Sequence, residues 1–454
     1  MPPSIPDASR WRRLHLIGIG GAGMSGIAKL LLARGVHVTG SDLKASEGLT
    51  GLEDLGATVF VGHRAEQVGS PDAVVISSAI RPENPELRAA EAAGIPVLMR
   101  AEVLAALMAG RRGIAVAGTH GKTTTTSMIA VMLSRLGLSP SFVIGGDLNE
   151  SGSGAQHGSG DLFVAEADES DGSFLLLRPD VGVVTNVEED HVDFYRTRDA
   201  VEAAFAEFGG HAGVVVACWD DPGVRRALGA ISDRVVSYGE AEGGRVVVRQ
   251  GARDEAAVIA VGDEHVPVWL AVPGRHNVLN AAAALAVADV LGLPVAAAAK
   301  ALESFTGVRR RFERRGTAAG ATFVDDYAHH PTEIAATIET ARRIASNGAG
   351  PWRRIVAVFQ PHRYSRTEAM WRPLGESLGG ADVVVVTDVY GAGEDPIPGI
   401  SGKLVVDAIA ESAPGRRVVY LPRRSEVAAF LASDVRDGDL VITLGAGDIT
   451  MVGD

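Results

Sequence analysis

The sequence is poor in cysteine, in aromatic residues and in positive charge. Its 454 residues include one cysteine, Cys218, so no disulfide can form within the chain and a reducing compartment is expected. Lysine and arginine total 43 against 56 acidic residues, which gives a formal net charge of −13. This balance disfavours general nucleic-acid binding, because that function needs a basic face. A chain of this length exceeds a single hydrophobic core, so several domains are expected.

The sequence also lacks an uninterrupted apolar segment of membrane-spanning length. Residues 281–299 come nearest, but Asp289, Gly292 and Pro294 interrupt them, and they predict a helix, a turn and a second helix. The apolar run near the N-terminus is broken by glycines, which is unlike a signal peptide. We therefore expect a soluble, cytoplasmic protein without membrane insertion.

Short β-branched runs alternate with Ala/Leu-rich stretches along almost the whole chain. This alternation is typical of parallel sheets covered by helices. Residues 235–270 differ, since short strands separated by polar turns predict a strand-rich insert there. Linker-like A-G-R-R-G and the basic segment G-V-R-R-R-F-E-R-R-G mark two boundaries, so we predict three α/β domains, comprising residues 1–109, 110–312 and 313–454.

The first motif is the glycine-rich string G-I-G-G-A-G-M-S-G, which follows an apolar run. Gly18, Gly20 and Gly23 spell G-x-G-x-x-G, and Asp42 lies nineteen residues after Gly23. This is the outline of a dinucleotide-binding fingerprint, in which glycines let the backbone and a helix start approach a diphosphate. A nicotinamide dehydrogenase is one interpretation, but it leaves a second phosphate loop unexplained.

That second loop, in A-V-A-G-T-H-G-K-T-T-T-T-S, is the strongest signal. Gly118 and Gly121 allow backbone N–H groups to turn toward phosphates at a helix start. Lys122 can reach the terminal phosphates, and the Thr123 hydroxyl can ligate Mg²⁺. The full G-x-x-x-x-G-K-[ST] pattern is not met, because Val116 takes the position of its first glycine.

Polar residues follow two later strands. Glu166 ends an apolar strand in E-A-D-E-S-D-G-S-F, and His191 lies in D-H-V-D-F-Y. Because ligands of an open α/β sheet collect at the carboxyl ends of its strands, both side chains are predicted to face the same crevice as Lys122. Carboxylate, hydroxyl and imidazole groups there can hold Mg²⁺ beside ATP phosphates. A solvated acidic loop is the alternative.

Three further motifs carry polar side chains. H-N-V-L-N at 276–280 starts an Ala-rich helix, either as simple N-capping or in contact with adenine. His329 and His330 are adjacent on a loop and therefore poor co-ligands of one metal ion. Arg363 and Arg366 can clamp carboxylate or phosphate groups.

Together these strings resemble the Mur ligase family. The motifs that match it run in family order and are G-I-G-G-A-G-M-S-G-I-A, G-T-H-G-K-T-T-T-T-S, E-A-D-E-S-D-G-S-F, D-H-V-D-F-Y, H-N-V-L-N-A, R-R-F-E, D-D-Y-A-H-H-P, F-Q-P-H-R-Y-S-R-T and L-G-A-G-D-I. The resemblance implies an N-terminal Rossmann-like domain for a UDP-sugar, a central P-loop-type ATP-binding α/β domain and a C-terminal Rossmann-like domain that supplies the amino acid. It further implies that ATP and Mg²⁺ serve to join L-alanine to the lactyl carboxylate of UDP-N-acetylmuramate through an acyl phosphate, in peptidoglycan precursor synthesis.

The resemblance also implies roles for individual residues. Lys122 would stabilise the transferring phosphoryl group, Thr123 and Glu166 would hold one Mg²⁺, and His191 would hold or orient a second. The implied ATP contacts are Gly118, Thr119, His120, Gly121, Lys122, Thr123, Thr124, His276, Asn277, Asn280, Arg311 and Asp326. The implied UDP-sugar contacts are Gly20, Gly21, Ala22, Gly23, Met24, Asp42, His63, Ser77 and Ser78. The implied amino-acid and carboxylate pocket consists of Tyr327, His329, Arg363 and Arg366.

The absence of one lysine that several Mur ligases use narrows the choice among the branches of the family. Several Mur ligases hold the second Mg²⁺ with a carbamoylated lysine of the central domain, yet no lysine lies between Lys122 and Lys300 here. This fits the alanine-adding branch and gives His191 more weight. A relative that joins a recycled tripeptide to the same UDP-sugar is the main alternative, and F-Q-P-H-R-Y-S-R-T favours the alanine enzyme. A non-catalytic nucleotide sensor would not need Lys122, Glu166 and His191. A monomer or homodimer is expected.

Overall fold

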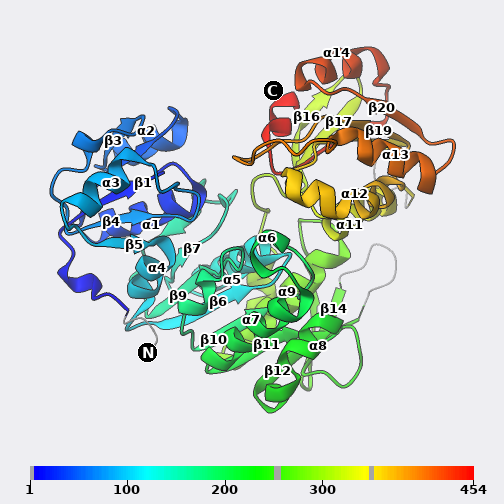
Figure 1. Ribbon diagram of the computed structural model, residues 1–454. Helices are drawn as coiled ribbons and strands as arrows, with labels where there is room; N and C mark the ends of the chain where they lie inside the picture. Colours follow the sequence, from blue (N-terminus) through cyan, green and yellow to red (C-terminus); the bar gives the residue numbers. More distant parts are fainter. Residues whose placement is uncertain (1–4, 250–256, 347–351, 454) are drawn as a thin grey trace.

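The computed structural model describes residues 5–249, 257–346 and 352–453, which form three α/β units with one sheet each (Figure 1). The N-terminal sheet has the order β3-β2-β1-β4-β5 and is parallel throughout. Its strands are β1 (Arg13–Ile17), β2 (His37–Asp42), β3 (Thr58–Val61), β4 (Ala73–Ile76) and β5 (Val97–Met99). The accompanying helices are α1 (Ala22–Ala33), α2 (Glu47–Asp54), α3 (Pro85–Ala92) and α4 (Arg100–Met108), with 3-10 turns η1 (Ala8–Arg10) and η2 (Ala65–Gln67). The order reverses at β1, as in a doubly wound fold.

The central sheet has the order β15-β14-β13-β12-β11-β10-β6-β9-β7-β8 in the described residues. Its strands are β6 (Arg112–Ala117), β7 (Ser141–Val143), β8 (Ala155–Gln156), β9 (Leu162–Glu166), β10 (Val181–Val184), β11 (Val214–Cys218), β12 (Val235–Gly239), β13 (Val246–Arg249), β14 (Ala257–Val261) and β15 (Glu264–Val268). The segment predicted as a strand-rich insert continues this sheet, with an antiparallel edge at β13, β14 and β15. Cys218 is buried at the end of β11.

Two apolar helices fill the interior of the central domain. The helices of this domain are α5 (Lys122–Arg135), α6 (Val192–Tyr195), α7 (Arg198–His211), α8 (Pro222–Leu228), α9 (Arg275–Val290) and α10 (Val295–Leu302), with η3 (Ser173–Leu176) and η4 (Gly229–Arg234). α5 and α9 pack on each other, and the Ala281–Ala288 run of α9 is fully buried. Small side chains allow this close approach, and burial all round explains why α9 lacks a polar face. Among the described helices, none has both the length and the hydropathy that crossing a membrane requires.

The C-terminal sheet has the order β16-β17-β21-β18-β19-β20. Its strands are β16 (Glu313–Ala318), β17 (Ala321–Asp326), β18 (Arg354–Phe359), β19 (Val383–Val386), β20 (Arg417–Tyr420) and β21 (Asp439–Leu444). Only the β16–β17 hairpin pairs antiparallel among these described strands. The covering helices are α11 (Pro331–Ser346), α12 (Tyr364–Leu378), α13 (Gly402–Ser412) and α14 (Arg424–Asp434), followed by η5 (Asp448–Gly453).

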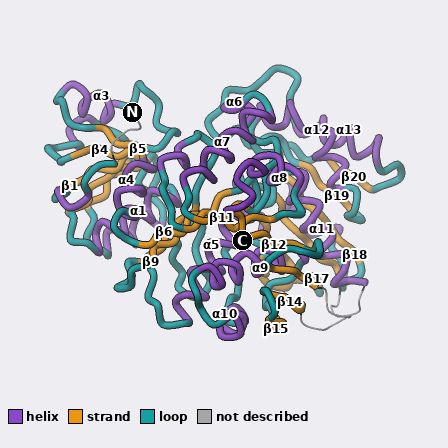
Figure 2. Tube along the Cα trace, turned by 90° about the horizontal axis from the view of Figure 1, so that it is seen from below, coloured by secondary structure: helices purple, strands orange, loops and turns teal. Residues whose placement is uncertain are grey.

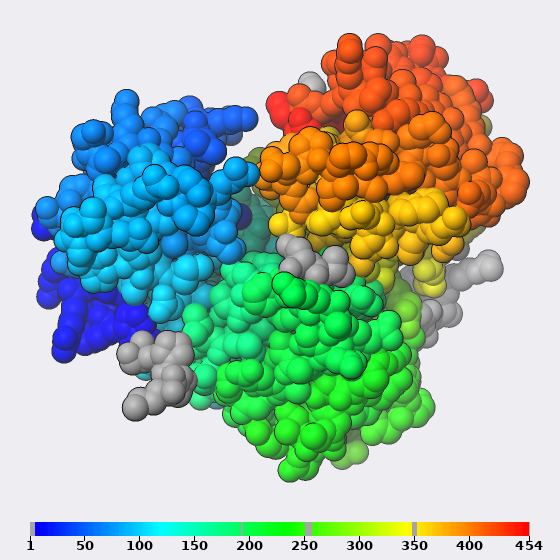
Figure 3. Space-filling view, viewed as in Figure 1, coloured from blue at the N-terminus to red at the C-terminus, as the bar shows by residue number. Residues whose placement is uncertain are grey.

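The N-terminal and C-terminal domains both lie on the central domain, and the view from below shows them on opposite sides of it (Figures 1 and 2). One hydrophobic cluster runs from α1 and α4 of the N-terminal domain to α7 of the central domain. Gly26 of α1 approaches Val143 so closely that an added Cβ would lie 3.1 Å from its side chain. The two outer domains also meet above the central one (Figure 3), where Arg81 donates a hydrogen bond of 2.8 Å to the Gly393 carbonyl.

Candidate active site

The phosphate loop connects β6 to α5, as the sequence predicts. Gly118 has φ +138°, and an added Cβ would lie 1.9 Å from the Thr185 hydroxyl, so only glycine fits there. Gly121 has φ +79° and is the residue before α5. The loop is fixed from β10, because the Thr185 hydroxyl donates to the His120 carbonyl at 2.6 Å and Asn186 accepts from the His120 N–H at 2.7 Å. Two further loop residues of the predicted ATP set, Thr119 and Thr124, are buried beside it.

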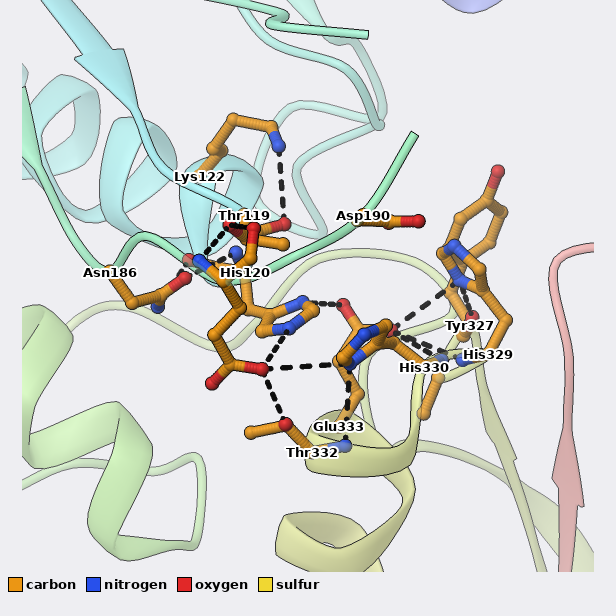
Figure 4. Close-up of polar contacts among 12 residues, drawn as sticks. Thr119, His120, Lys122, Asn186, Asp190, Tyr327, His329, His330, Thr332 and Glu333 are labelled. Atoms are coloured by element: carbon orange, nitrogen blue, oxygen red, sulfur yellow. Dashed lines mark hydrogen bonds and ion pairs between the residues drawn. The ribbon is translucent and has the colours of Figure 1, made fainter. Parts of the chain in front are cut away.

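The Lys122 ammonium lies across this loop and beside a buried carboxylate. Its Nζ donates to the Gly118 carbonyl at 2.6 Å and to Glu169 Oε1 at 2.8 Å (Figure 4 shows Lys122 above the loop). Glu169 is 2% exposed, and this burial raises its pKa to about 7 against the opposing effect of Lys122. The carboxylates around Lys122 raise the pKa of the ammonium despite its burial, so the lysine keeps its charge where phosphates would enter.

A hydroxyl and a carboxylate converge at the start of α5. Thr123 Oγ1 donates to Glu166 Oε1 at 2.9 Å, and the Gly145 N–H donates to Glu166 Oε2 at 2.6 Å. Glu166 ends β9, which pairs in parallel with β6, so the strand-end argument correctly places it beside the phosphate loop. The two oxygen-bearing side chains form the hard donor set that Mg²⁺ prefers.

His191 and Lys122 both lie beside the carboxylate of Glu169. His191 Nε2 is 3.7 Å from Glu169 Oε1 and 3.7 Å from Asp190 Oδ2. The residue has φ +52°, and burial lowers the pKa of its imidazole. A neutral imidazole in this position has a free electron pair for a metal ion or a hydrogen-bond donor.

The H-N-V-L-N motif forms the first turns of α9 and faces the phosphate loop. Asn280 Oδ1 accepts from Thr125 Oγ1 at 3.1 Å, and Asn277 Nδ2 donates to the Pro273 carbonyl at 2.6 Å. Burial and the nearby arginine lower the pKa of His276 to about 4. Beside this helix start opens a pocket of about 310 Å³, whose lining includes Trp269, Pro273, Gly274, Arg275 and Thr340.

The C-terminal domain contributes the next set of polar groups. Asp326 ends β17 and accepts hydrogen bonds from Thr337 Oγ1 and from the Phe312 N–H, each at 3.1 Å. Burial raises the pKa of Asp326 to about 6. The guanidinium carbon of Arg311 lies 4.9 Å from the centre of the Tyr327 ring, which fits a cation–π contact.

The adjacent histidines of this domain point to different partners, as expected for residues that do not share a metal ion. His329 Nδ1 lies 3.0 Å from the Tyr327 carbonyl, and the His329 N–H donates to Glu333 Oε2 at 3.1 Å. His330 instead packs against His120 of the phosphate loop, with ring centres 4.4 Å apart and the ring planes tilted by 40° (Figure 4). The amino-acid role of His329 stays a prediction, whereas His330 contacts the central domain through His120 and Glu188.

Both predicted arginine clamps hold carboxylates of the protein itself. Arg366 makes three contacts of 3.0, 3.1 and 3.2 Å with the Asp190 carboxylate, and both residues are buried. The guanidinium holds the pKa of Asp190 far below its usual range. Arg363, with φ +71°, places its Nε 3.1 Å from Glu394 Oε1. Arg366 thus links the C-terminal domain to the central domain next to His191.

The predicted UDP-sugar residues gather at the carboxyl edge of the N-terminal sheet. The Gly20 N–H donates to Asp42 Oδ2 at 2.9 Å, and His63 Nδ1 lies 2.9 Å from Ser41 Oγ. Gly21 immediately precedes α1 and is followed in the helix by the rest of the predicted loop, Ala22, Gly23 and Met24. After β4, Ser77 is half-buried and Ser78 exposed.

The sequence motifs do not identify several charged residues of the candidate site. An added Cβ on Gly23 would lie 2.6 Å from Arg100 Nη1, so this arginine reaches the first glycine loop. Its other Nη lies 3.2 Å from Asp168 Oδ2 of the central domain. Arg100 stands alone in the sequence, at the start of α4 and far from any motif. Glu169 and Asp190 lie within two of the motifs. Nothing in those motifs indicates that Lys122 pairs with Glu169 or that Arg366 pairs with Asp190.

The fold and this arrangement define a class of multidomain, nucleotide-dependent ligases. Three family models match the chain in succession: the Mur ligase family catalytic domain at residues 13–112, the Mur ligase middle domain at 116–288 and the Mur ligase glutamate ligase domain at 310–447. The chain belongs to the Mur ligase family.

Its relatives narrow the class further. The chain is 49% identical to the UDP-N-acetylmuramate–L-alanine ligase of Saccharopolyspora erythraea, over 100% of this chain and 94% of that protein. It is 51% identical to the enzyme of the same name from Kineococcus radiotolerans, over 99% and 96%. The crystal structure of UDP-N-acetylmuramate–alanine ligase from Thermotoga maritima matches with a TM-score of 0.82 and 31% identity, over 97% of each chain. A murein peptide ligase from Psychrobacter arcticus also matches over 97% of each chain, with a TM-score of 0.73 and 25% identity.

Proposed function

We propose that this chain joins L-alanine to the lactyl carboxylate of UDP-N-acetylmuramate, with ATP converted to ADP and phosphate. The observation that carries the proposal is the convergence of Lys122, the Thr123–Glu166 pair and His191 at one crevice, which the C-terminal domain covers through Arg366. Full-length relatives that bear the alanine-ligase name support the choice of substrates. The single cysteine fits a cytoplasmic location, where ATP and UDP-sugars are made.

Each domain takes one part of the reaction. The first glycine loop and Arg100 offer N–H groups and a guanidinium to the diphosphate of the UDP-sugar. The phosphate loop and the start of α9 take ATP, and the pocket beside His276 is the proposed adenine side. Arg311, at the domain boundary, and Asp326 of the C-terminal domain would reach the nucleotide. Tyr327, His329, Arg363 and Arg366 of the C-terminal domain would surround the amino acid.

Two anions must react, so positive charge is needed between them. The lactyl carboxylate attacks the γ-phosphorus, the bond to the β-phosphate oxygen breaks, and an acyl phosphate and ADP result. Lys122 is placed to stabilise the charge of the transferring group. The neutral amine of L-alanine then attacks the acyl carbon, phosphate leaves with its bonding electrons, and the proton lost by the nitrogen passes to the released phosphate. Closure of the C-terminal domain would exclude water, which would otherwise hydrolyse the acyl phosphate.

The residues present suit Mg²⁺ as the accompanying ion. Thr123 and Glu166 supply oxygen ligands and would hold one ion, and His191 would hold or orient a second. When bound, Mg²⁺ neutralises phosphate charge beside the loop.

Phosphate release measures this proposal directly. We expect release to require ATP, Mg²⁺, UDP-N-acetylmuramate and L-alanine together. With ¹⁸O in the lactyl carboxylate, one label should appear in the released phosphate, because the carboxylate oxygen stays on phosphorus. Release that depends on a tripeptide in place of L-alanine would favour the recycling ligase, and unlabelled phosphate would contradict the acyl-phosphate route.

A further inference from the structure

Three side chains from two domains meet behind the phosphate loop. His120 belongs to the loop and His330 precedes α11, as Figure 4 shows, and Glu188 follows β10 in the chain. One nitrogen or oxygen of each lies within 4.8 Å of the other two. Glu188 Oε2 is 3.4 Å from His120 Nε2 and 3.8 Å from His330 Nδ1. His120 also belongs to the predicted ATP set, whereas Glu188 and His330 have no assigned part in the ligase reaction proposed above.

Two of the three spacings approach those around a tetrahedral metal ion. Zinc binds imidazole nitrogen and carboxylate oxygen at about 2.0–2.2 Å, which places two ligand atoms about 3.3 Å apart in a tetrahedron. The distances in the cluster exceed this by half an ångström or less for both pairs that involve Glu188. Two imidazoles and one carboxylate favour zinc and similar transition metals, whereas Mg²⁺ prefers oxygen alone.

The surroundings of the cluster support a ligand there independently of this spacing. His120 Nδ1 lies 3.3 Å from Glu333 Oε1, the far-side carboxylate contact that orients metal-bound histidines. The Thr332 hydroxyl donates to Glu188 Oε2 at 2.7 Å and fixes that carboxylate. His330 is 5% exposed, and the ring nitrogen that faces Glu188 is its Nδ1, which lies 3.4 Å from the Thr332 N–H.

Charges of both signs are already present in the cluster. Arg311 lies 3.9 Å from Glu333 Oε1, and contacts with Glu188 and Glu333 raise the pKa of His120 to about 9 against the effect of burial. An ion that binds His120 Nε2 would therefore displace a proton to solvent, as metal ions do from histidine ligands.

We propose that His120, Glu188 and His330 form a binding site for one divalent transition-metal ion of the zinc type, with water completing the tetrahedron. The bound ion ties the phosphate loop to the first turn of α11. It thereby holds the central and C-terminal domains in the arrangement described here. A bound zinc ion would disfavour separation of these domains and would take no part in the ligase chemistry.

Cobalt(II), a spectroscopic substitute for zinc, tests the site in the full-length protein without an affinity tag. Titration in excess Mg²⁺ should show one equivalent bound with tetrahedral d–d absorption, and Zn²⁺ should displace it. Glu188→Gln and His330→Ala should each weaken binding at least a hundredfold, and Glu333→Gln tenfold to a hundredfold. His37→Ala removes an exposed histidine of β2 and should change nothing. Circular dichroism establishes that each variant is folded.

X-ray absorption of the wild-type zinc complex makes the result independent of how the variants fold. Two imidazole nitrogens in the zinc shell are expected. An all-oxygen shell, the absence of saturable binding, or affinity that stays the same in folded Glu188→Gln and His330→Ala would overturn the proposal. Because every readout is metal binding, the outcome is independent of whether the ligase substrates are correctly assigned.

Discussion

Replacing Lys122 with methionine removes the ammonium from the phosphate loop and keeps most of its aliphatic stem. The wild-type Nζ is held by the Gly118 carbonyl and by Glu169, so it is preorganised where the proposed function needs a positive charge for the transferring phosphate. One preorganised donor at a site of developing charge contributes about 2.7–4 kcal/mol to the transition state. The turnover number of Lys122→Met should therefore fall by about 10²–10³-fold or more.

The same substitution also leaves Glu169 buried without its cation, and this cost must be separated from catalysis. An unpaired buried charge costs about 3–5 kcal/mol, but the pKa of Glu169 is already about 7, so the carboxyl group will take up a proton instead. We expect a loss of about 1–3 kcal/mol in unfolding free energy near neutral pH. Because the pKa in the folded state lies above that in the unfolded chain, stability decreases as the pH rises through it, so the loss should grow above pH 7.

The double variant Lys122→Met/Glu169→Gln distinguishes the two effects. Its melting temperature should return toward that of the wild type, because no buried charge remains, while its turnover should stay low. Lys300→Met, which removes an exposed lysine of α10, is the control and should leave both quantities unchanged. Turnover is measured as phosphate release at saturating substrates. Wild-type activity in the double variant, or residual turnover of Lys122→Met within tenfold of wild type, would refute a direct role for the lysine charge.

Three other changes probe separate parts of the molecule. Burial raises the pKa of Asp326 to about 6, above its value in the unfolded chain. Asp326→Asn should therefore stabilise the C-terminal domain by at most about 3 kcal/mol at pH 8 and by less at pH 5. Equal increases in unfolding free energy at both pH values, measured by calorimetry, would contradict this. Arg366→Met and Asp190→Asn should be non-additive in thermal unfolding, with a coupling of about 1.5 kcal/mol or more; additivity would mean that the buried pair contributes nothing. Gly118→Ala should abolish ATP binding in calorimetry because its Cβ would overlap a threonine hydroxyl, whereas Gly137→Ala, also at positive φ but with open space, should cost about 1–2 kcal/mol and keep binding.

The architecture was largely predictable because its signals are local. Glycine-rich strings at strand ends predicted the helix starts at Ala22 and Lys122, and the interrupted alanine run predicted a turn between α9 and α10. The place of residues 235–270 in the central sheet was harder to predict from the sequence. Their short strands were expected, but whether they formed an insert or extended the sheet depends on pairing between β12 and β13, which no local pattern encodes.

Part of the site followed from one geometrical rule, and part did not. The carboxyl ends of parallel strands share an edge, so Glu166 could be placed beside Thr123 from the sequence. The partners of Lys122 and Arg366 could not, because the attraction between Arg366 and Asp190 acts across 176 residues and across a domain boundary. A charged residue in a sequence does not show whether its counter-ion is a ligand or another side chain.

Pairing of these charged residues with carboxylates of the protein affects how they would bind substrates. His120, Arg363 and Arg366 are predicted to meet anionic substrates, yet in the described structure each is already close to a carboxylate of the protein. Asp190 occupies the Nε and Nη2 of Arg366, so a substrate carboxylate that binds these two atoms would replace Asp190. Its affinity would then reflect the difference between two ion pairs and not the full strength of one. The released Asp190 would then carry an uncompensated charge next to His191. That charge attracts cations, so binding of the anionic substrate and binding of a cation at His191 should favour each other.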